Sequence, residues 1–382
     1  MTSADADAVT QDFVDRHRRQ PTGVWVAPGR VNLIGEHTDY NDGFVMPFAL
    51  AQAVTVAAAP RDDDRWSVTS LSNGESREFG RADLQPGMSG WPAYVAGVVW
   101  ALAEGGHQVS GADLVLTSDV PIGAGLSSSA ALECAVLAAL ADLDALQIEP
   151  LERAKLARRC ENEFVGAPTG LMDQAASTLC TADHALFFDC RTFEATQVSL
   201  QLGAADLELL VLDTSTPHTH VDGEYADRRR TCEEAAAILG VPALRDVDDL
   251  DAALAALPEE VMRRRVRHVV TENARVQAAA AVLQRGQVAE LAPLLDASHV
   301  SMRDDFEITA PTVDLAVETA RAAGAVGARM TGGGFGGCII ALVPTGRADA
   351  VAAAVADAFA EAGFAPPQHF VGVPSRGAHR AV

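Results

Sequence analysis

The spacing of apolar residues divides the chain into two stretches that contain different elements. In the first stretch, short apolar and β-branched runs predict strands at Val24–Ala27, Ala53–Ala59, Trp66–Ser70 and Asp113–Thr117. Apolar residues that recur at helical spacing then predict helices over Ser127–Leu146 and Leu151–Glu163. Strands followed by helices in this order are typical of an α+β arrangement.

The second stretch begins with a strand, which we expect at Leu207–Leu212. Helical spacing then predicts Asp227–Leu239, Glu259–Arg285, Val288–Ser298 and Thr312–Ala323. The tail returns to a strand, a helix and a strand, at Cys338–Val343, Ala348–Ala362 and His369–Val373. We therefore expect two α+β domains, 1–200 and 201–382, which meet near residues 190–206, where the pattern alone changes.

Charge and hydropathy exclude several classes of protein. The 382 residues carry a net charge of −23, which repels nucleic acid and anionic membranes. No apolar run reaches the roughly 20 residues of a membrane span, and the first 20 residues lack the apolar core of a signal peptide. We expect a cytoplasmic protein without nucleic-acid or membrane partners, either a monomer or a weak homo-oligomer.

Two residue types limit the chemistry further. Lys155 is the only lysine, so a lysine-based phosphate loop of the GxxxxGK[ST] kind is absent. A bound nucleotide would depend on arginine, backbone N–H groups and a divalent ion. The six cysteines form no CxxC pair, which predicts reduced, buried thiols and no structural zinc site.

The segment 29–40, GRVNLIGEHTDY, concentrates polar groups that a folding core does not need. Buried polar groups are costly unless each finds a partner, and a small hydroxylated ligand supplies such partners. The alternative is structural: Arg30 and Asp39 form an ion pair, His37 is a satisfied core histidine, and Glu36 lies on the surface.

The segment 121–132, PIGAGLSSSAAL, follows a predicted strand and begins a predicted helix. Gly123 and Gly125 permit close approach of backbone to a ligand, and the start of the helix can hold an anion. A hydroxyl among Ser127–Ser129 can also ligate Mg²⁺. A glycine turn followed by serine N-caps explains the same residues equally well.

Two more segments carry candidate chemistry. In CENEFVGAPTGLMDQ, residues 160–174, Glu161 is either a magnesium ligand or a solvated helix residue. Asp173 either orients or deprotonates a substrate hydroxyl, or caps a helix. The glycine run 331–338, TGGGFGGC, predicts a tight loop near a cleft, a hairpin between two strands, or both.

Three of these segments, in this order, resemble the motifs of the GHMP small-molecule kinases, which include galactokinase, homoserine kinase and mevalonate kinase. The sequence of residues 29–40, GRVNLIGEHTDY, is similar to the motif of the galactokinase branch in particular. The resemblance implies Mg²⁺-dependent phosphoryl transfer from ATP to the C1 hydroxyl of α-D-galactose. It also implies an N-terminal mixed-sheet α+β domain, a ferredoxin-like C-terminal domain and an active site in the cleft between them.

The resemblance also implies a role for each matching residue. Asp173 is the expected catalytic aspartate and Arg30 the arginine beside it. The expected sugar-binding residues are Glu36, His37, Asp39, Gly170 and Tyr225. The expected nucleotide-binding residues are Gly123, Gly125, Leu126, Ser127, Ser128, Ser129 and Ala130, with Trp91 and Tyr94 near the adenine. Ser129 and Glu161 are the expected metal ligands. Trp91 and Tyr94, three residues apart, equally fit helix packing.

Other functions remain compatible with parts of this pattern. A catalytically inactive sugar sensor would bind galactose and ATP without turnover, but here the serine loop is uninterrupted and Asp173 is present. An N-acetylgalactosamine or arabinose kinase would carry much the same motifs. Homoserine or mevalonate kinase is disfavoured by residues 36–40 of the first motif.

Overall fold

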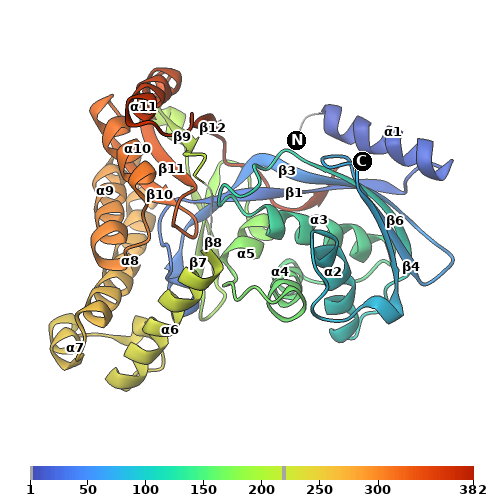
Figure 1. Cartoon of the computed structure of the whole chain (residues 1–382), viewed down its shortest axis with the longest axis horizontal. Helices are drawn as coiled ribbons and strands as arrows, with labels where there is room; N and C mark the ends of the chain where they lie inside the picture. Colours follow the sequence, from blue (N-terminus) through green and yellow to red (C-terminus); the bar gives the residue numbers. More distant parts are fainter. Residues whose placement is uncertain (1–2, 217–220) are drawn as a thin grey trace.

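The computed structural model describes residues 3–216 and 221–382. In these ranges the strands form sheets of six, four and three strands. Figure 1 shows an elongated molecule, with the N-terminal elements at one end and α8–α11 at the other. Two regions with separate sheets confirm the expected α+β architecture, although the larger hydrophobic core extends from the six-stranded sheet to one face of the four-stranded sheet.

The six-stranded sheet is built mainly from the N-terminal part of the chain. Its order is β13-β1-β3-β6-β4-β5, and only the β4–β6 pair is parallel, so the sheet is mixed as expected. Its strands are β1 (Gly23–Asn32), β3 (Pro47–Pro60), β4 (Arg65–Ser70), β5 (Ser76–Gly80), β6 (Ala112–Ser118) and β13 (His379–Arg380).

Helices cover both faces of this sheet. The first helix, α1 (Ser3–His17), lies on one face, where Val9 and Phe13 are fully buried against the sheet. The other face carries α2 (Pro92–Glu104), α3 (Ser128–Leu143), α4 (Pro150–Arg159) and α5 (Met172–Leu179) (Figure 1). A wider π-helical turn, Cys160–Val165, continues α4 and carries Glu161.

A small three-stranded sheet lies beside the C-terminal helices. It contains β2 (Phe44–Val45), β7 (His184–Asp189) and β8 (Ala195–Ser199). The backbone N–H of Phe44 donates to Asn273 Oδ1 on α8 at 2.8 Å, which ties this sheet to the C-terminal part.

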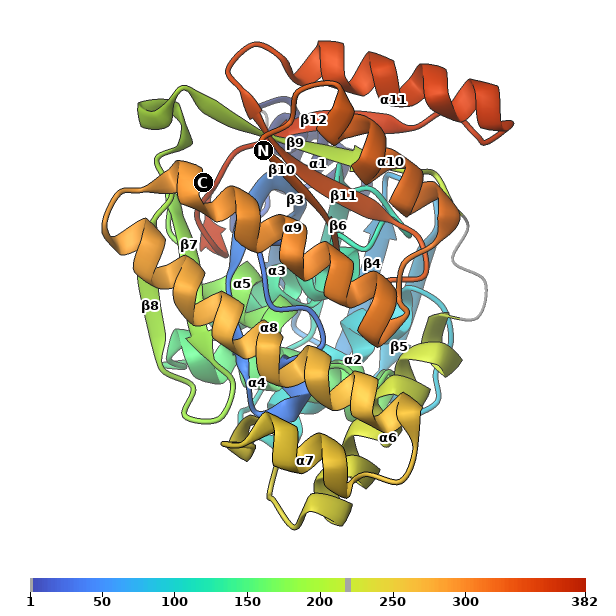
Figure 2. The ribbon, with the colours of Figure 1, turned by 90° about the vertical axis from the view of Figure 1, so that its left-hand side faces the viewer.

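The C-terminal part is an antiparallel four-stranded sheet with the order β10-β11-β9-β12. Its strands are β9 (Leu207–Asp213), β10 (Gly327–Thr331), β11 (Cys338–Pro344) and β12 (Gln368–Gly372). Its helices are α6 (Val221–Leu239), α7 (Leu250–Ala256), α8 (Glu260–Gln284), α9 (Leu291–Ser301), α10 (Pro311–Ala322) and α11 (Ala348–Ala362). With β9 and β11 central, this order confirms the ferredoxin-like arrangement. Figure 2 shows α8 and α9 running side by side in front of the sheets.

The two parts are joined more than once. The four-stranded sheet begins at Leu207, close to the expected junction near residues 190–206. The end of the chain, however, returns to the first sheet, where β13 pairs with β1 through Trp25↔Arg380 and Val26↔His379. A division into 1–200 and 201–382 stays a prediction, and by its pairing the tail belongs with the first part.

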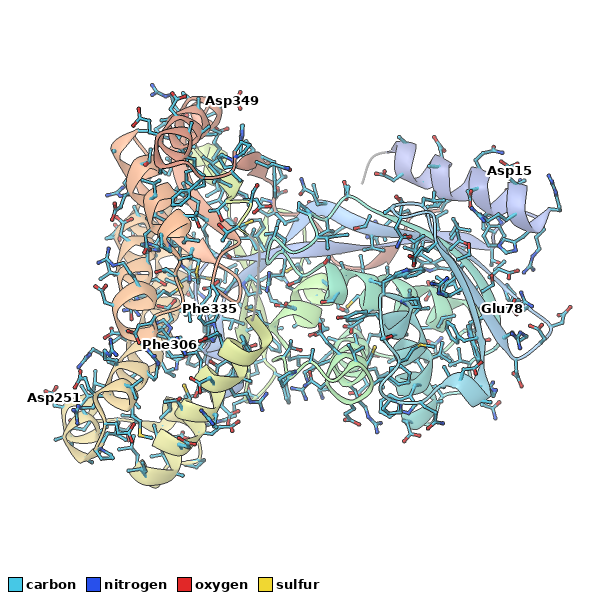
Figure 3. All side chains as sticks on the ribbon, viewed as in Figure 1. Asp15, Glu78, Asp251, Phe306, Phe335 and Asp349 are labelled. Atoms are coloured by element: carbon cyan, nitrogen blue, oxygen red, sulfur yellow. The ribbon has the colours of Figure 1, made fainter. Side chains whose placement is uncertain are left out.

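Acidic side chains lie on the surface of the protein, and aromatic and cysteine side chains lie in its interior. Asp15, Glu78, Asp251 and Asp349 are exposed at widely separated edges of the molecule, whereas Phe306 and Phe335 lie with the core of the four-stranded sheet (Figure 3). All six cysteines are free and buried. Within residues 3–216 and 221–382, the structure has no helix long and apolar enough to cross a membrane.

Candidate active site

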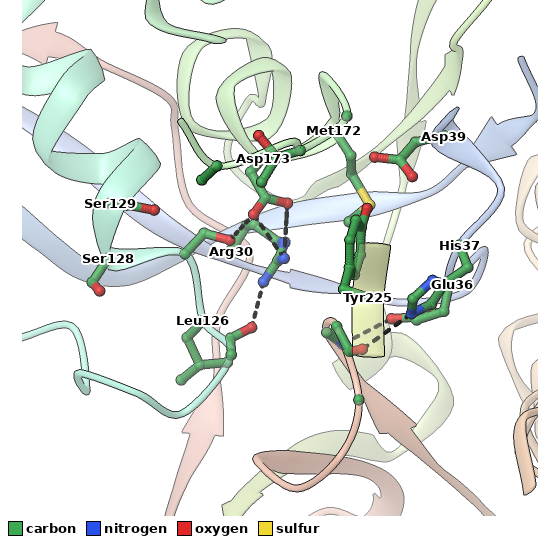
Figure 4. Close-up of a pocket in the computed structure, with 18 of the residues that line it drawn as sticks. Arg30, Glu36, His37, Asp39, Leu126, Ser128, Ser129, Met172, Asp173 and Tyr225 are labelled. Carbon is green, nitrogen blue, oxygen red and sulfur yellow. Dashed lines mark hydrogen bonds and ion pairs between the residues drawn. The ribbon is translucent and has the colours of Figure 1, made fainter. Parts of the chain in front are cut away.

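A cavity of about 480 Å³ lies between the two parts of the molecule, and every polar segment singled out in the sequence contributes to it. Its lining comes from residues 30–39, 123–129, 167–173 and 332–334, with Tyr225 from α6. Figure 4 shows Arg30 and Asp173 in the middle, Ser128 and Ser129 on one side, and Glu36, His37 and Asp39 on the other. The cavity therefore has two ends that meet at the arginine–aspartate pair.

Arg30 and Asp173 form a bidentate ion pair. Arg30 Nε donates to Asp173 Oδ1 at 2.8 Å, and Nη2 donates to Oδ2 at 2.9 Å. Arg30 Nη1 donates to the carbonyl of Gly125 at 2.6 Å, and the Ser127 hydroxyl donates to Asp173 Oδ2. Because Arg30 is 5% exposed on β1, these bonds fix Asp173 in one orientation.

The position of Asp173 excludes the helix-cap interpretation. Asp173 lies in the first turn of α5, whose N-cap is Leu171. Its carboxylate accepts from Arg30 and Ser127 and retains partial access to the cavity, with 23% of the side chain exposed. A carboxylate placed this way can accept a proton or a hydrogen bond from a ligand hydroxyl.

The start of α3 forms one wall of the cavity. The N-cap of α3 is Ser127, which has a left-handed backbone (φ 59°). The Ser127 hydroxyl donates a hydrogen bond to Asp173. Within the described residues, no side-chain hydrogen bond caps this helix, so its first N–H groups remain available to an anion. The glycine loop packs against this wall so closely that a Cβ on Gly332 would lie 2.8 Å from the carbonyl oxygen of Gly125.

Ser129 and Glu161 meet as the sequence predicted for a metal site. The Ser129 hydroxyl donates to Glu161 Oε1 at 2.8 Å, and Thr169 and Gln174 each donate to Oε2 at 2.7 Å. Burial, followed by the charge of Asp173, raises the pKa of Glu161. No group of three or more acidic, histidine or cysteine side chains in the described ranges is arranged to hold a metal. A Mg²⁺ here would need nucleotide phosphates as further ligands, which is how Mg²⁺ is usually bound.

Asp39 and Gly170 line the opposite end of the cavity. Asp39 Oδ1 accepts from the backbone N–H of Tyr40 at 3.0 Å. A Cβ on Gly170 would lie 1.7 Å from Asp39 Oδ2, so a larger residue there would displace the Asp39 carboxylate. Burial, reinforced by the nearby Asp173 charge, raises the pKa of Asp39 to about 6.

Glu36 and His37 also line the cavity, but the protein already uses much of their hydrogen-bonding capacity. Glu36 pairs with the buried Arg329 and accepts from the backbone N–H of Gly332 at 3.0 Å. His37 Nε2 donates to the carbonyl of Gly333 at 3.0 Å, and Nδ1 accepts from the Tyr40 hydroxyl at 2.7 Å. Burial lowers the pKa of His37 to about 3, so the ring is neutral. A hydrogen bond from His37 to a sugar would require one of these two bonds to break.

Tyr225 completes the wall from α6. Its ring centre lies 4.9 Å from that of His37 and 5.5 Å from that of Tyr40. Aromatic rings clustered in this way offer an apolar surface for the C–H face of a ligand. The structure therefore brings Tyr225 to the same end of the cavity as the first motif.

The comparisons with known proteins agree with this geometry. The galactokinase galactose-binding signature matches residues 11–60, and the GHMP kinase N-terminal and C-terminal domains match 93–181 and 279–361. A galactokinase of Streptomyces coelicolor is 52% identical over 100% of both chains. The chain belongs to the galactokinase family. A relative from Mycobacterium tuberculosis, also named galactokinase, is 49% identical over 89% of this chain and 94% of its own length.

Solved structures support family membership. Lactococcus lactis galactokinase complexed with galactose superposes with a TM-score of 0.93 at 32% identity, covering 98% of this chain and 99% of that one. Mevalonate kinase from Methanococcus jannaschii shares the fold alone, with a TM-score of 0.67 at 16% identity, over 92% of this chain and 98% of that one. Membership in the galactokinase family confirms the resemblance seen in the motifs and places the chain among the phosphotransferases.

Three residues that the galactokinase resemblance assigned to the nucleotide do not line this cavity. Trp91, Tyr94 and Ala130 are not among the described residues that line the cavity. The Trp91 indole N–H donates to Glu75 Oε2 at 2.9 Å. The rings of Trp91 and Tyr94 both pack against the largest hydrophobic core of the protein. Their assignment to adenine stays a prediction, and the packing alternative accounts for what the structure shows of them.

Some residues of the site were not predicted. Thr169, which binds Glu161, follows Pro168 in the loop that the sequence identified only by its glycines and proline. Arg329 lies in β10, just before the glycine run, where the sequence analysis predicted no strand. The alternation of apolar and polar residues over 328–331 is the signal that could have identified this strand, and a buried arginine needs a partner.

Proposed function

We propose that this chain transfers the γ-phosphoryl group of ATP to the C1 hydroxyl of α-D-galactose, giving galactose 1-phosphate and ADP. The observation that carries the proposal is the Arg30–Asp173 pair, set between the open start of α3 and the Asp39–Gly170 end of the cavity. This arrangement suits phosphoryl transfer, which needs alignment of the reactants and stabilisation of charge.

In this proposal, Asp39 and Glu36 accept hydrogen bonds from sugar hydroxyls, and Gly170 lets the sugar approach the backbone. Carboxylates give strong directional acceptance, and a sugar of the wrong configuration leaves one of them unpaired. Tyr225 and His37 shape the apolar wall. The galactose-binding signature across residues 11–60 supports placing the sugar at this end.

Asp173 accepts a hydrogen bond from the C1 hydroxyl and so orients this hydroxyl. It receives the hydroxyl proton either before the transfer or as the C1 oxygen bonds to phosphorus. The C1 oxygen then bonds to the γ-phosphorus, and the bond from that phosphorus to the bridging oxygen of ADP breaks. Arg30 holds the Asp173 carboxylate in one orientation and offsets the charge of the transferring group. The N–H groups at the start of α3 face the nucleotide phosphates.

We infer that Ser129 and Glu161 hold Mg²⁺ together with the phosphates. When bound, the ion neutralises phosphate charge and orients the nucleotide. The contact between their side chains supports this assignment, since both donors already meet at one point. The cytoplasmic location and the monomeric or weakly oligomeric state belong to the same proposal, and light scattering after size-exclusion chromatography tests the second.

An ADP-release assay tests the proposed function. Galactose should support turnover, whereas glucose, N-acetylgalactosamine, arabinose, homoserine and mevalonate should support far less. Asp173→Asn keeps the shape of the side chain and should abolish turnover while galactose binding, measured by calorimetry, survives. Saturable galactose binding without ADP release by the parent chain would instead favour a sensor.

A further inference from the structure

A fully buried ion pair joins the first motif to the four-stranded sheet. Arg329 on β10 and Glu36 have side chains that are 0% and 1% exposed, and Arg329 Nη2 donates to Glu36 Oε2. Arg329 Nη1 donates to the carbonyls of Leu33 at 2.9 Å and Asn32 at 3.3 Å. One guanidinium therefore binds both the side chain and the backbone of the segment that forms the sugar end of the cavity.

The second carboxylate oxygen of Glu36 is fixed as well. Glu36 Oε1 accepts from the backbone N–H of Gly332 at 3.0 Å, at the start of the glycine loop. A carboxylate has about four lone-pair sites, so capacity remains for a ligand after these bonds. Glu36 lines the cavity, whereas Arg329 is absent from the described lining residues. Glu36 is therefore the cavity-lining side chain that Arg329 binds.

The charges around Glu36 leave Arg329 as its counter-ion. Glu272 on α8 lies 3.9 Å from Arg329 Nη2, but it also binds Arg275 Nε at 2.7 Å and Ser298 Oγ at 2.7 Å. Burial lowers the pKa of His37 to about 3 and that of His268 to about 4, so neither adds positive charge at neutral pH. Burial raises the pKa of Glu36, and Arg329 opposes that rise.

We propose that Arg329 is a positioning residue for the sugar: it holds the Glu36 carboxylate in one orientation, so that this carboxylate can accept a hydrogen bond from a sugar hydroxyl. The inference rests on the proposed function of the same cavity. It predicts a remote residue that governs sugar affinity without touching sugar or nucleotide.

Arg329→Met tests the proposal because it keeps much of the apolar volume and removes the charge. We expect the galactose KM, and the galactose Kd measured by calorimetry without nucleotide, to rise at least about tenfold, while the ATP KM stays within about twofold. The loss of the counter-ion raises the pKa of Glu36. The pH below which galactose binding weakens, which Asp39 sets in the parent chain, should therefore move up as Glu36 joins Asp39 in taking up a proton, and a loss of stability alone would not cause this shift.

A double-mutant cycle separates this role from a structural one. If Arg329 governs sugar affinity through Glu36 and not through its bonds to the Leu33 and Asn32 carbonyls, Glu36→Gln and Glu36→Gln/Arg329→Met should have the same galactose KM within about twofold. This comparison also serves if Arg329→Met alone does not fold, since the double variant buries no unpaired charge. Arg329→Lys keeps the charge and should have an intermediate KM with the pH midpoint of the parent.

Arg265→Met provides a matched control. Arg265 is 3% exposed and binds the Asp305 carbonyl and Glu307, so its loss should lower the melting temperature and leave the galactose KM within about twofold. An unchanged galactose Kd in Arg329→Met, or a further KM increase in the double variant over Glu36→Gln, would overturn the inference. A parent chain without ADP release would overturn the proposed function instead.

Discussion

Protonation of Asp39 should weaken sugar binding in mildly acidic solution. Burial, reinforced by the charge of Asp173, raises the pKa of Asp39 to about 6, whereas Arg30, Arg229 and the Tyr40 N–H oppose the rise. A sugar hydroxyl donates to the ionised carboxylate, so binding needs the deprotonated form. Because the pKa is raised, the competent form is dominant above pH 6 and is lost as the pH falls through 6.

The size of this effect follows from the pKa. With a pKa of about 6, the ionised fraction of Asp39 is about 0.9 at pH 7 and about 0.1 at pH 5, so the galactose Kd should rise about tenfold between them. Binding also releases the proton that the free protein holds. At pH 6, about half a proton should leave for each sugar bound, and at pH 8 almost none.

Calorimetry without nucleotide measures both quantities. Titrations in two buffers with different ionisation enthalpies give the number of protons released, and titrations from pH 5 to 8 give the Kd. In Asp39→Asn, the galactose Kd should no longer depend on pH. The free energy of galactose binding at pH 8 should be less favourable than in the parent by about 1.5–3 kcal/mol, the value of a hydrogen bond to a charged group. A Kd that is flat from pH 5 to 8 in the parent, or equal proton release in the variant, would refute this reasoning.

The remaining predictions concern the other residues of the cavity. Gly170→Ala places a methyl group where the Asp39 carboxylate lies, so the galactose KM should rise by as much as about 10²-fold in steady-state assays while the ATP KM changes little. Arg30→Ala should lower kcat about 10³-fold and change either KM far less, because its charge acts mainly in the transition state; an unchanged kcat would contradict that role. Glu161→Gln should raise the Mg²⁺ concentration for half-maximal rate at least about tenfold without altering galactose binding, which a magnesium titration and calorimetry distinguish.

Helices with one polar face were the easiest elements to predict. Helix α11 has the predicted bounds, Ala348–Ala362, and α8 differs from its prediction by one residue at each end. Helix α2 was missed because most of its residues are buried, so apolar side chains occur on all sides and leave no helical period. Strand β10 was missed for a different reason: it has five residues, includes glycine and alanine, which are depleted in strands, and runs directly into the glycine loop.

The sequence predicted which residues belong to the site where a single motif contains them, but it did not predict the contacts between residues of distant segments. The motifs identified Arg30 and Asp173, and the structure brings them into contact across 143 positions. The sequence did not indicate that the Ser127 hydroxyl would turn toward Asp173, away from its own helix. Nor did it indicate that Glu36 would pair with Arg329, 293 positions away. Such contacts depend on the packing of the two sheets, which local patterns do not specify.

The same packing explains how a strongly acidic chain can hold an anionic nucleotide. The net charge is −23, and among the described lining residues Arg30 is the only arginine or lysine. Its guanidinium is paired with Asp173, so it adds little net positive charge for binding the nucleotide before the reaction, and its proposed effect is on the transition state. The uncapped start of α3 is a further source of positive potential, and the Mg²⁺ proposed near Ser129 and Glu161 would be another. Because the Ser127 hydroxyl binds Asp173, it leaves those N–H groups free, and one bond thus orients the catalytic carboxylate and keeps the phosphate site open.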